Sequence, residues 1–468
     1  MPEAESDWTR SSPRPVDPRV TTVHWRGNTV KSIVIVGGGY AGFYAARGLE
    51  RRLRRGEAEV TVIDAAPYMT YQPFRPEVAA GSIEARHAIV PLRRHLRRAR
   101  LLAGRVHRID HGERAVHVVL PDGSRTAIAY DEVIVTAGAV SRVFPVPGVA
   151  EQAIGFKRIE EAVAIRDAVL TSIEEASALP AGAERRRRLT VTFVGGGFAG
   201  VEGFAEVLSM ARALISKYDA LASTELNFHL VDAAERILPE VRPSASTWVK
   251  RYLERQGAVV HLRTTVQEAS GSHLRLSTGE VIDTGLLVWT AGIAANPVIA
   301  RHTDLPINDR GLVVVRPDLR VGTATDPVAS AWAAGDDAAV PDLANPGAYT
   351  TPNAQHAVRQ GKRLARNVVA VLRGRDPRPY RHRNLGTIAT LGIGQGIFES
   401  GPITLKGLPA WVVHRGYHLF TVPTAERKLR VLLGWLTGLV VGRDIASLAR
   451  VQHPRDAFLE DAHRPGAG

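Results

Sequence analysis

The sequence contains no cysteine among its 468 residues. Disulfide bonds, thiolate metal sites, cysteine nucleophiles and dithiol redox centres are therefore excluded together. It also lacks any run of about 18 to 20 consecutive apolar residues, the length that a membrane-spanning helix needs. A chain of this length must bury ordinary hydrophobic cores instead, and roughly 150 residues per domain suggests about three domains.

An apolar signal segment is lacking as well. Residues 1–29 are rich in proline, arginine and aspartate, and we expect a disordered tail there. The sixteen histidines form no H-E-x-x-H motif and no tight cluster, so no metal site is proposed. These absences predict a cytoplasmic protein, which would reach a membrane only as a peripheral protein on the cytoplasmic face of the cell membrane.

Acidic residues are too few to balance the basic ones: 47 Asp and Glu face 60 Lys and Arg, a net charge of +13 at pH 7. An excess of positive charge favours anionic partners such as nucleic acid, acidic lipid or an acidic protein. The alternative is that codon bias toward arginine produces the excess of positive charge, in which case the charge indicates no partner. The arginine runs at 51–55, 93–98 and 185–188 lack a nucleic-acid-binding motif and interleaved aromatic residues. We therefore expect solvated faces and no nucleic acid.

Glycine, in contrast, is abundant, and two motifs of the form G-x-G-x-x-G stand out. Each follows an apolar strand and opens a helical pattern, with strands expected at 31–36 and 189–194. The motif glycines are Gly37, Gly39 and Gly42 in the first copy, and Gly195, Gly197 and Gly200 in the second. The first glycine permits a tight turn, the second lets the backbone approach a pyrophosphate, and the third lets the helix pack on the strand.

Both copies continue into a second strand that ends in an acid. Asp64 ends the first of these strands, and Asp232 ends the other. A carboxylate at this place is expected to accept hydrogen bonds from a ribose. A further pair of near-copies closes the two repeats. They read Thr136-Ala-Gly138 and Thr290-Ala291-Gly292.

Residues 31–370 resemble the two-dinucleotide-binding flavoproteins of the pyridine-nucleotide disulfide reductase superfamily. The resemblance implies an α/β fold with two Rossmann-type dinucleotide-binding domains, the second inserted in the first, and a small C-terminal membrane-facing module. The implied divisions are 30–150 and 301–375 for the FAD-binding domain, 151–300 for the NADH-binding domain and 376–468 for the C-terminal module. Between the repeats we expect a connecting helix at 160–175 and a basic surface loop at 183–188.

The resemblance also implies tightly but non-covalently bound FAD, with NADH as the exchanging cosubstrate. The segment Ala-Ala-Gly335-Asp336 is similar to the second FAD motif, whose aspartate binds the ribityl chain. Asp232 would favour NADH over NADPH by repelling a 2′-phosphate, with Arg236 close to it in sequence. The implied FAD contacts are Gly37, Gly39, Gly42, Asp64, Thr136, Gly138, Gly335, Asp336 and Gln355. The implied NADH contacts are Gly195, Gly197, Gly200, Glu202, Asp232, Ala291 and Gly292.

The missing cysteines select a branch of this superfamily. Disulfide reductases, sulfide:quinone reductases and cysteine-based peroxide or oxygen reductases need a thiol beside the flavin, so electrons must here leave the flavin directly. The sequence is similar to type II NADH:quinone oxidoreductases at 71–81, 90–93, 289–297, 354–357 and 385–392, and in its aromatic C-terminal module. The resemblance implies transfer of two electrons from NADH through flavin to a membrane quinone, without proton pumping, by a monomer or a homodimer.

Three residues have catalytic roles by this resemblance. Glu202 matches an acid that faces the flavin and the nicotinamide, and the alternative is a carboxylate on a helix surface. Gln355 matches the first glutamine of a family A-Q-x-A-x-Q segment beside the isoalloxazine and the quinone headgroup. Arg359 stands where the family has the second glutamine and is followed by Gln360. The family often has basic residues after 385–392, where this chain has Ile-Gly-Gln.

An apolar stretch near the C-terminus, residues 431–441, carries the membrane interpretation. A helix of that length reaches about 17 Å and cannot cross a hydrocarbon core of about 30 Å. The stretch fits an interfacial anchor whose basic flanks meet anionic lipid, and a buried or dimer-forming helix is the alternative. The flanking basic residues are Arg427, Lys428, Arg430 and Arg443, and the preceding aromatic residues are Trp411, Tyr417 and Phe420.

Two other functions remain open from the sequence. A soluble NAD(P)H-dependent reductase of ferredoxin or another small acidic carrier would also suit a charge of +13. A flavin-bound redox sensor or partner-binding protein with little turnover would use the same two dinucleotide sites. Membrane association together with quinone turnover would distinguish the NADH:quinone oxidoreductase from both of these alternatives. Turnover that depends on a carrier protein would distinguish the reductase from the sensor.

Overall fold

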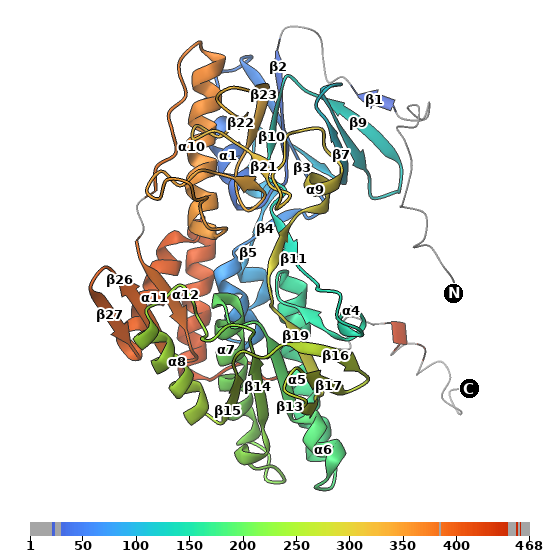
Figure 1. Ribbon diagram of the computed structural model, residues 1–468, viewed down its shortest axis with the longest axis vertical. Helices are drawn as coiled ribbons and strands as arrows, with labels where there is room; N and C mark the ends of the chain where they lie inside the picture. The colour runs from blue at the N-terminus through green and yellow to red at the C-terminus, as the bar shows by residue number, and fades with distance from the viewer. Residues whose placement is uncertain (1–20, 24–29, 383–384, 448–454, 457–458, 460–468) are drawn as a thin grey trace. The chain divides into compact units, whose positions relative to one another are not determined.

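The chain forms two compact units from interleaved segments (Figure 1). The computed structural model describes residues 21–23, 30–382, 385–447, 455–456 and 459. The first unit takes 1–69, 91–138 and 295–382, and the second takes 70–90, 139–294 and 383–468. These units differ from the divisions at 150, 300 and 375 implied by the resemblance, because residues 70–90 and the C-terminal segment pack with the second unit.

A six-stranded sheet forms the centre of the first unit, in the order β22-β23-β10-β2-β3-β6. Its strands are β2 (Lys31–Val36), β3 (Ala58–Asp64), β6 (Arg100–Ala103), β10 (Glu132–Val135), β22 (Arg320–Gly322) and β23 (Pro327–Ala333). All neighbours are parallel except β22 and β23. The apolar run of β2 is buried from Ile33 to Val36, as expected of a parallel strand covered on both faces.

Two helices of the first unit pack closely together, α1 (Tyr40–Glu50) and α10 (Ala354–Leu372) (Figure 1). Their contact depends on small residues. A Cβ atom on Gly361 would lie 2.4 Å from the carbonyl oxygen of Ala41. Helix α10 begins at Ala354, because the side chain of Asn353 caps it by accepting a hydrogen bond from the backbone N–H of His356 at 2.8 Å.

A second sheet of the first unit has the order β1-β9-β8-β7. Its strands are β1 (Thr21–Val23), β7 (Arg105–Asp110), β8 (Ala115–Val119) and β9 (Arg125–Ala129). Strand β1 lies parallel to β9, so its three residues depart from the expected disordered tail. The rest of that tail, residues 1–20 and 24–29, lies outside the described residues.

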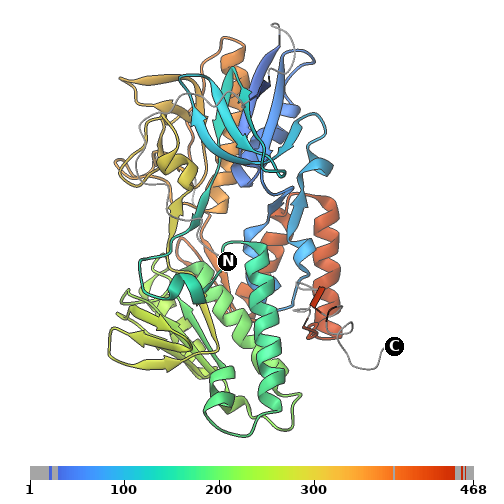
Figure 2. The same ribbon diagram turned by 90° about the vertical axis from the view of Figure 1, so that its right-hand side faces the viewer.

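The second unit contains a five-stranded parallel sheet in the order β12-β19-β13-β14-β15. Its strands are β12 (Ile154–Gly155), β13 (Thr190–Val194), β14 (Asn227–Val231), β15 (Ala258–His261) and β19 (Leu286–Trp289). Helices α5 (Ile159–Ser177) and α7 (Phe198–Ile215) pack against it (Figure 2). Helix α5 confirms the connecting helix expected at 160–175.

A small antiparallel sheet completes the core of this region of the second unit. It consists of β16 (Val266–Ser270), β17 (His273–Leu276) and β18 (Val281–Asp283). One buried cluster joins it to the parallel sheet, with Leu274 and Leu276 meeting Val231 and Trp289. Helix α7 is anchored separately, by Phe204 between the rings of two sheet phenylalanines.

The C-terminal residues of the second unit form a hairpin sheet and two helices. The strands are β25 (Thr387–Thr390), β26 (Gly396–Ser400) and β27 (Ile403–Lys406), and the helices are α11 (Leu408–Thr421) and α12 (Ala425–Val440). Helix α11 packs on all three strands. None of the described helices is both long enough and apolar enough to cross a membrane.

The remaining elements are short connections, apart from a 13-residue helix that packs against β15. The helices among them are α2 (Arg75–Ala79), α3 (Leu92–His95), α4 (Val149–Gln152), α6 (Ala183–Arg188), α8 (Pro243–Arg255) and α9 (Pro297–Arg301). The strands are β4 (Tyr68–Thr70), β5 (Ile89–Pro91), β11 (Ala139–Ser141), β20 (Ile293–Ala295), β21 (Val313–Val314) and β24 (Ala338–Ala339). The 3-10 turns are η1 (Gln72–Phe74), η2 (Ala85–His87) and η3 (Ser223–Glu225).

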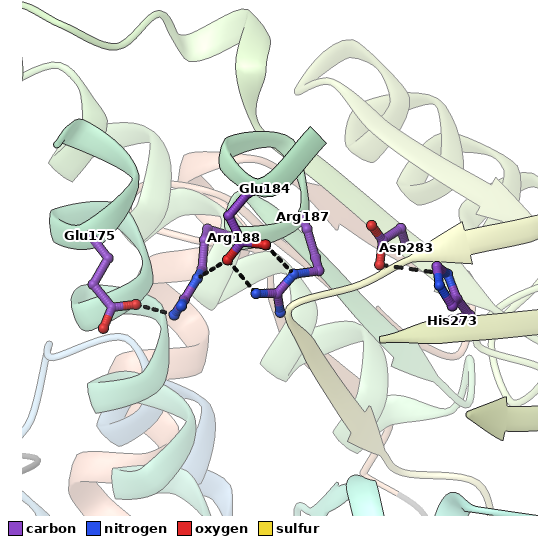
Figure 3. A network of polar contacts seen from close by, with 6 residues as sticks. All are labelled: Glu175, Glu184, Arg187, Arg188, His273 and Asp283. Carbon is purple, nitrogen blue, oxygen red and sulfur yellow. Dashed lines mark hydrogen bonds and ion pairs between the residues drawn. The ribbon is translucent and has the colours of Figure 1, made fainter. Parts of the chain in front are cut away.

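The arginine run at 183–188 is helix α6, and the loop expected there is wrong (Figure 3). Glu184 in its first turn pairs with Arg187 and Arg188, at the i+3 and i+4 spacings that only a helix brings together. Arg188 also pairs with Glu175 at the end of α5. The run is therefore partly neutralised by its own acids, in keeping with a solvated face.

Candidate functional site

The first glycine motif forms a tight turn between β2 and α1 in the first unit. Gly37 has a φ of +98°, and a Cβ there would lie 2.2 Å from the carbonyl oxygen of Thr136. Gly42 is equally restricted, because a Cβ there would lie 1.8 Å from the carbonyl oxygen of Gly37. Gly39 is different: a Cβ there would meet nothing within 4 Å. Open space beside the N-terminus of α1, where Gly39 offers no side-chain cap, is the expected place of a pyrophosphate.

Asp64 lies beside this turn at the end of β3. Its carboxylate accepts hydrogen bonds from the backbone N–H groups of Gly38 at 2.6 Å and Ala66 at 2.8 Å. Burial raises the pKa of Asp64, and the two N–H donors oppose that rise. The Thr136 hydroxyl donates to the carbonyl oxygens of Val36 and Gly37, both at 3.0 Å. The strand-end acid and the closing threonine are thus both brought to the first glycine turn.

The Gly335-Asp336 segment follows β23, the parallel neighbour of β10. Gly335 has a φ of +103°, and its N–H donates to the side-chain oxygen of Gln360 at 2.8 Å. Burial raises the pKa of Asp337, the residue after this segment, to about 7. Hydrogen bonds from the backbone N–H groups of Ala137 and Gly138 oppose that rise. The 136–138 and 335–337 segments therefore meet at one edge of the sheet, where the resemblance places two of the FAD contacts.

The second unit repeats this geometry at the second glycine motif. Gly195 has a φ of +118°, and a Cβ on Gly200 would lie 1.9 Å from the carbonyl oxygen of Gly195. A Cβ on Gly197, as on Gly39, would meet nothing within 4 Å. The Thr290 hydroxyl donates to the carbonyl oxygens of Val194 and Gly195 at 2.8 and 3.1 Å. Each unit therefore has one glycine turn of this geometry at a helix N-terminus, which we call its glycine cradle.

Asp232 stands in the second cradle where Asp64 stands in the first. Its carboxylate accepts from the backbone N–H of Gly196 and from that of Ala234 at 2.7 Å. Arg236, which could have held a 2′-phosphate, donates instead to the carbonyl oxygens of Pro239 and Val241 at 2.7 and 2.6 Å. Its guanidinium is thus engaged by its own loop.

The three residues with expected catalytic roles lie in different units. Glu202 lies in the second turn of α7 in the second unit; it accepts a hydrogen bond from the Thr390 N–H at 2.9 Å, and its side chain is 13% exposed. Gln355 and Arg359 both lie on α10 in the first unit, where Gln355 is half-buried. Arg359 donates to the Nδ1 atom of His382 at 2.7 Å. Their expected roles stay predictions.

A buried residue that sequence reasoning did not assign is Gln360. It is 1% exposed, and besides accepting from Gly335 it donates to the Thr350 hydroxyl at 3.0 Å. Gln360 therefore holds the Gly335 turn in place. The sequence did contain a sign of this role, because a glutamine stands one position after the place where the family pattern has its second glutamine.

The second missed group is a pair of buried ion pairs in the second unit. Glu77 of α2 lies 3.6 Å from Arg415 of α11, and it accepts a hydrogen bond from the Trp435 indole of α12 at 2.6 Å. Glu206 of α7 pairs with Arg443 at 3.0 Å. Both glutamates are fully buried. These contacts join the C-terminal segment to α2 and α7 of the same unit. No sequence pattern indicates which glutamate pairs with which arginine.

The same contacts correct part of the predicted lipid-facing surface. Arg443 is buried against Glu206, and Arg427 is buried as well. Trp411 is 8% exposed because its ring stacks on the Arg415 guanidinium, 4.5 Å away. Phe420, in contrast, is 79% exposed. The aromatic and basic residues of this region thus serve internal packing more than the sequence suggested.

Two glycine turns of this geometry, each at a helix N-terminus and each beside a strand-end aspartate, define a protein with two dinucleotide sites. Residues 31–361 match the family described as pyridine nucleotide-disulphide oxidoreductase. The chain is 30% identical to the type II NADH:quinone oxidoreductase NdhA of Mycobacterium tuberculosis, with 86% of each chain covered. It is 29% identical to the type II NADH:quinone oxidoreductase of Haemophilus influenzae, with 81% of this chain and 90% of that protein covered.

The fold agrees with these sequence matches. A structure of NDH2 from Plasmodium falciparum in complex with NADH superimposes with a TM-score of 0.80 at 18% identity, over 89% of this chain and 99% of that chain. The chain therefore belongs to the pyridine nucleotide-disulphide oxidoreductase family, and within it to the type II NADH:quinone oxidoreductases.

Proposed function

We propose that the protein is an FAD-dependent NADH dehydrogenase that passes two electrons to a membrane quinone without pumping protons. The observation that carries the proposal is the pair of glycine cradles, one in each unit, in a family member without any cysteine. Because the chain has no thiol that could store electrons, the acceptor must take the electrons directly from the flavin. The names of the relatives support NADH as the donor and a quinone as the acceptor.

The first cradle suits FAD. The open position beside Gly39 would take the pyrophosphate, and Asp64 would bind the adenosine ribose. Asp336, beside the turn that Gln360 holds, would bind the ribityl chain. The second cradle would take NADH in the same manner, with the pyrophosphate at Gly197 and the ribose at Asp232.

The division of labour follows from these assignments. Bound flavin supplies a carrier that accepts a hydride and releases electrons in a separate step. The protein's part is to bind and orient the reactants: α1 and α7 present their N-terminal N–H groups, and the strand-end acids select the riboses. Glu202, near the start of α7, would face the flavin and the nicotinamide, and Gln355 with Arg359 would face the isoalloxazine and the quinone headgroup.

The C-terminal helices would bring the enzyme to its lipid-soluble acceptor. Val431 and Trp435 of α12 are buried, whereas the opposite face of the helix is apolar and exposed. That face consists of Leu429, Leu432, Leu433, Leu436, Leu439 and Val440. Together with Phe420 and Val412 of α11, it is far larger than the scattered apolar residues usual on a protein that stays in water. We assign it to the acyl boundary of the cytoplasmic leaflet.

A flotation assay with liposomes tests this assignment. The double variant Leu433→Glu/Leu436→Glu should lose binding to vesicles of anionic lipid, and its reduction of a long-chain quinone should fall at least tenfold. A matched control is Val281→Glu, since Val281 of β18 is 56% exposed and lies outside α11 and α12. Loss of a dimer in the double variant with unchanged vesicle binding would show that the face is a subunit interface instead.

A comparison of acceptors tests the reaction itself. NADH oxidation is measured with a soluble quinone, a ferredoxin and oxygen in parallel, at equal enzyme concentration. The proposal predicts that the quinone gives the largest kcat/KM. A larger value with ferredoxin would replace the quinone by an acidic carrier, and turnover with none of the three would leave a flavin-bound sensor.

A further inference from the structure

We propose that His414, His418 and Tyr71 form a proton-transfer line of the second unit that ends at Glu202 and supplies protons for quinone reduction. The inference rests on the proposed function and adds residues that carry protons within it. Its basis is a row of polar side chains between α7, η1 and α11. All of them belong to one unit.

The inner end of the line is Glu202. One carboxylate oxygen lies 3.6 Å from the Nε2 atom of His414, which is within ion-pair range and slightly beyond a hydrogen bond. His414 is 1% exposed, and neither of its ring nitrogens has a hydrogen-bond partner among the described residues. A buried imidazole without partners is unfavourable, because its polar atoms have lost water and gained nothing in exchange. A small ring rotation would complete the bond to Glu202, so His414 is poised to exchange a proton with it.

The outer part of the line is joined by hydrogen bonds from His418 to Thr421, whereas His414 meets His418 through a ring contact alone. The rings of His414 and His418, one turn apart on α11, have centroids 4.4 Å apart. The Nδ1 atom of His418 lies 3.0 Å from the Tyr71 hydroxyl, which lies 2.6 Å from the Thr421 hydroxyl. Thr421 donates in turn to the carbonyl oxygen of Tyr417 at 2.9 Å. The Tyr71 hydroxyl can therefore accept a hydrogen bond from one of these neighbours while it donates to the other, as a proton carrier must.

Burial suits His418 to this task. Burial, with the neighbouring His414 adding to it, holds the pKa of His418 well below 6.5, so the ring is neutral at pH 7. A neutral imidazole has one donor and one acceptor nitrogen, so it can take a proton on one side while it gives one on the other. The titratable and charged groups around the two rings are Glu202 and Glu206 of α7, Glu77 of α2, Tyr71, and Arg415 and Tyr417 of α11.

The line ends at the apolar surface. Thr421 is half-buried and follows Phe420, which is 79% exposed on the face assigned to lipid. Protons would thus enter beside the membrane surface and leave at Glu202.

The reaction requires such a supply. NADH gives up a hydride, which is two electrons and one proton, and becomes NAD⁺. A quinone that becomes a quinol gains two electrons and two protons on its oxygen atoms. Each turnover therefore takes one net proton from solvent, and both quinol protons must reach the oxygen atoms of the bound quinone. Ferricyanide, in contrast, accepts electrons alone.

The test compares two acceptors in two variants of the FAD-loaded enzyme. Tyr71→Phe keeps the ring and removes the hydroxyl, and His418→Asn keeps a polar group that cannot carry a proton. Reduction of a soluble quinone should fall about 10²-fold at pH 8, within the range of general acid–base effects. It should recover as the pH is lowered to 6, because hydronium replaces the missing donor. NADH-to-ferricyanide transfer should stay within twofold. His107→Asn in β7 of the first unit is the control and should change neither rate.

A second readout does not depend on activity. Histidine side-chain ¹⁵N NMR of the whole chain should show His418 as a neutral ring at pH 6, with a shift that moves in Tyr71→Phe. Equal loss of quinone and ferricyanide rates in both variants would overturn the proposal in favour of a packing role. Unchanged quinone rates would overturn it as well. If the wild type transferred electrons to ferricyanide but to no quinone, the proposed function would fail, and the line with it.

Discussion

Asp64 and Asp232 show how one residue type performs one task in two places. Each ends the second strand of its unit and accepts from the N–H of the residue after the first motif glycine, Gly38 or Gly196. Each also accepts from a backbone N–H two residues onward. The carboxylates are thus fixed by local backbone before any ribose arrives, and fixed groups lose little entropy on binding.

The first prediction concerns Asp232 and the choice of nicotinamide nucleotide. Asp232→Ala removes the charge that would repel a 2′-phosphate, and Arg236 is already engaged by Pro239 and Val241. The ratio of kcat/KM for NADH over NADPH should therefore fall at least tenfold, mainly through weaker use of NADH. Steady-state kinetics with both nucleotides measures it. A wild type that prefers NADPH would contradict the assignment of Asp232.

At this scale, the sequence predicted what depends on backbone spacing and failed where distant side chains meet. The glycine turns and the strand-end aspartates could be placed because a turn between a strand and a helix fixes its residues locally. The role of Gln360 could not, since its partner Gly335 lies 25 positions away and the family pattern has the glutamine one position earlier. The buried Asp337 was also missed, because the motif assigns its role to the adjacent residue Asp336.

At the scale of elements, α12 shows two faces with opposite tasks. Its inner face, with Arg427, Val431 and Trp435 at every fourth position, packs into the second unit. Its outer face is apolar throughout the middle of the helix. The apolar stretch and its helical form could be predicted from the sequence. Which of the basic and aromatic residues turn inward could not, because that choice depends on acids of α2 and α7 that lie hundreds of positions earlier.

The second prediction concerns the buried pair that holds α11 and α12. Arg415 lies between the rings of Trp411 and Trp435, 4.5 Å from each, and faces Glu77. Arg415→Met should cost about 3 to 5 kcal/mol of unfolding free energy, because it leaves a buried carboxylate without its cation. Chemical denaturation followed by tryptophan fluorescence measures the loss.

The matched control for that variant is the double change Glu77→Gln/Arg415→Met. Glutamine keeps an acceptor for the Trp435 indole and carries no charge to bury. The double variant should be more stable than Arg415→Met alone. A single variant as stable as the wild type would mean that the Glu77–Arg415 pair contributes nothing to the attachment of the C-terminal helices.

For the whole molecule, buried histidines set the acid limit of stability. Burial lowers the pKa of His107, His229 and His356 to about 4, and that of His418 well below 6.5. The unfolded chain takes up these protons near pH 6.5, whereas the folded chain does not. Their stabilisation is therefore complete above pH 6.5 and is lost as the pH falls toward 4. Carboxyl groups whose pKa is raised by burial act in the opposite direction: Asp337, with a pKa of about 7, and also Asp64, Glu77 and Glu132.

The third prediction follows from that balance. The melting temperature should be nearly constant from pH 8 to 7 and should fall steadily between pH 6.5 and 4.5. Differential scanning calorimetry at constant ionic strength measures it, with His229→Asn as a variant that should flatten the fall. A melting temperature that rises over this interval would show that buried carboxyl groups dominate the proton balance.

The central claim is that electrons pass from NADH to a quinone through flavin alone, and a stoichiometric titration tests it most directly. Purified protein is reduced anaerobically with one equivalent of NADH, and its flavin absorbance near 450 nm is followed while a soluble quinone is added. The account predicts that NADH bleaches the flavin and that one equivalent of quinone restores the full absorbance, with one equivalent of quinol formed. Bleached flavin that quinone leaves unchanged, or protein that holds no flavin, would contradict it.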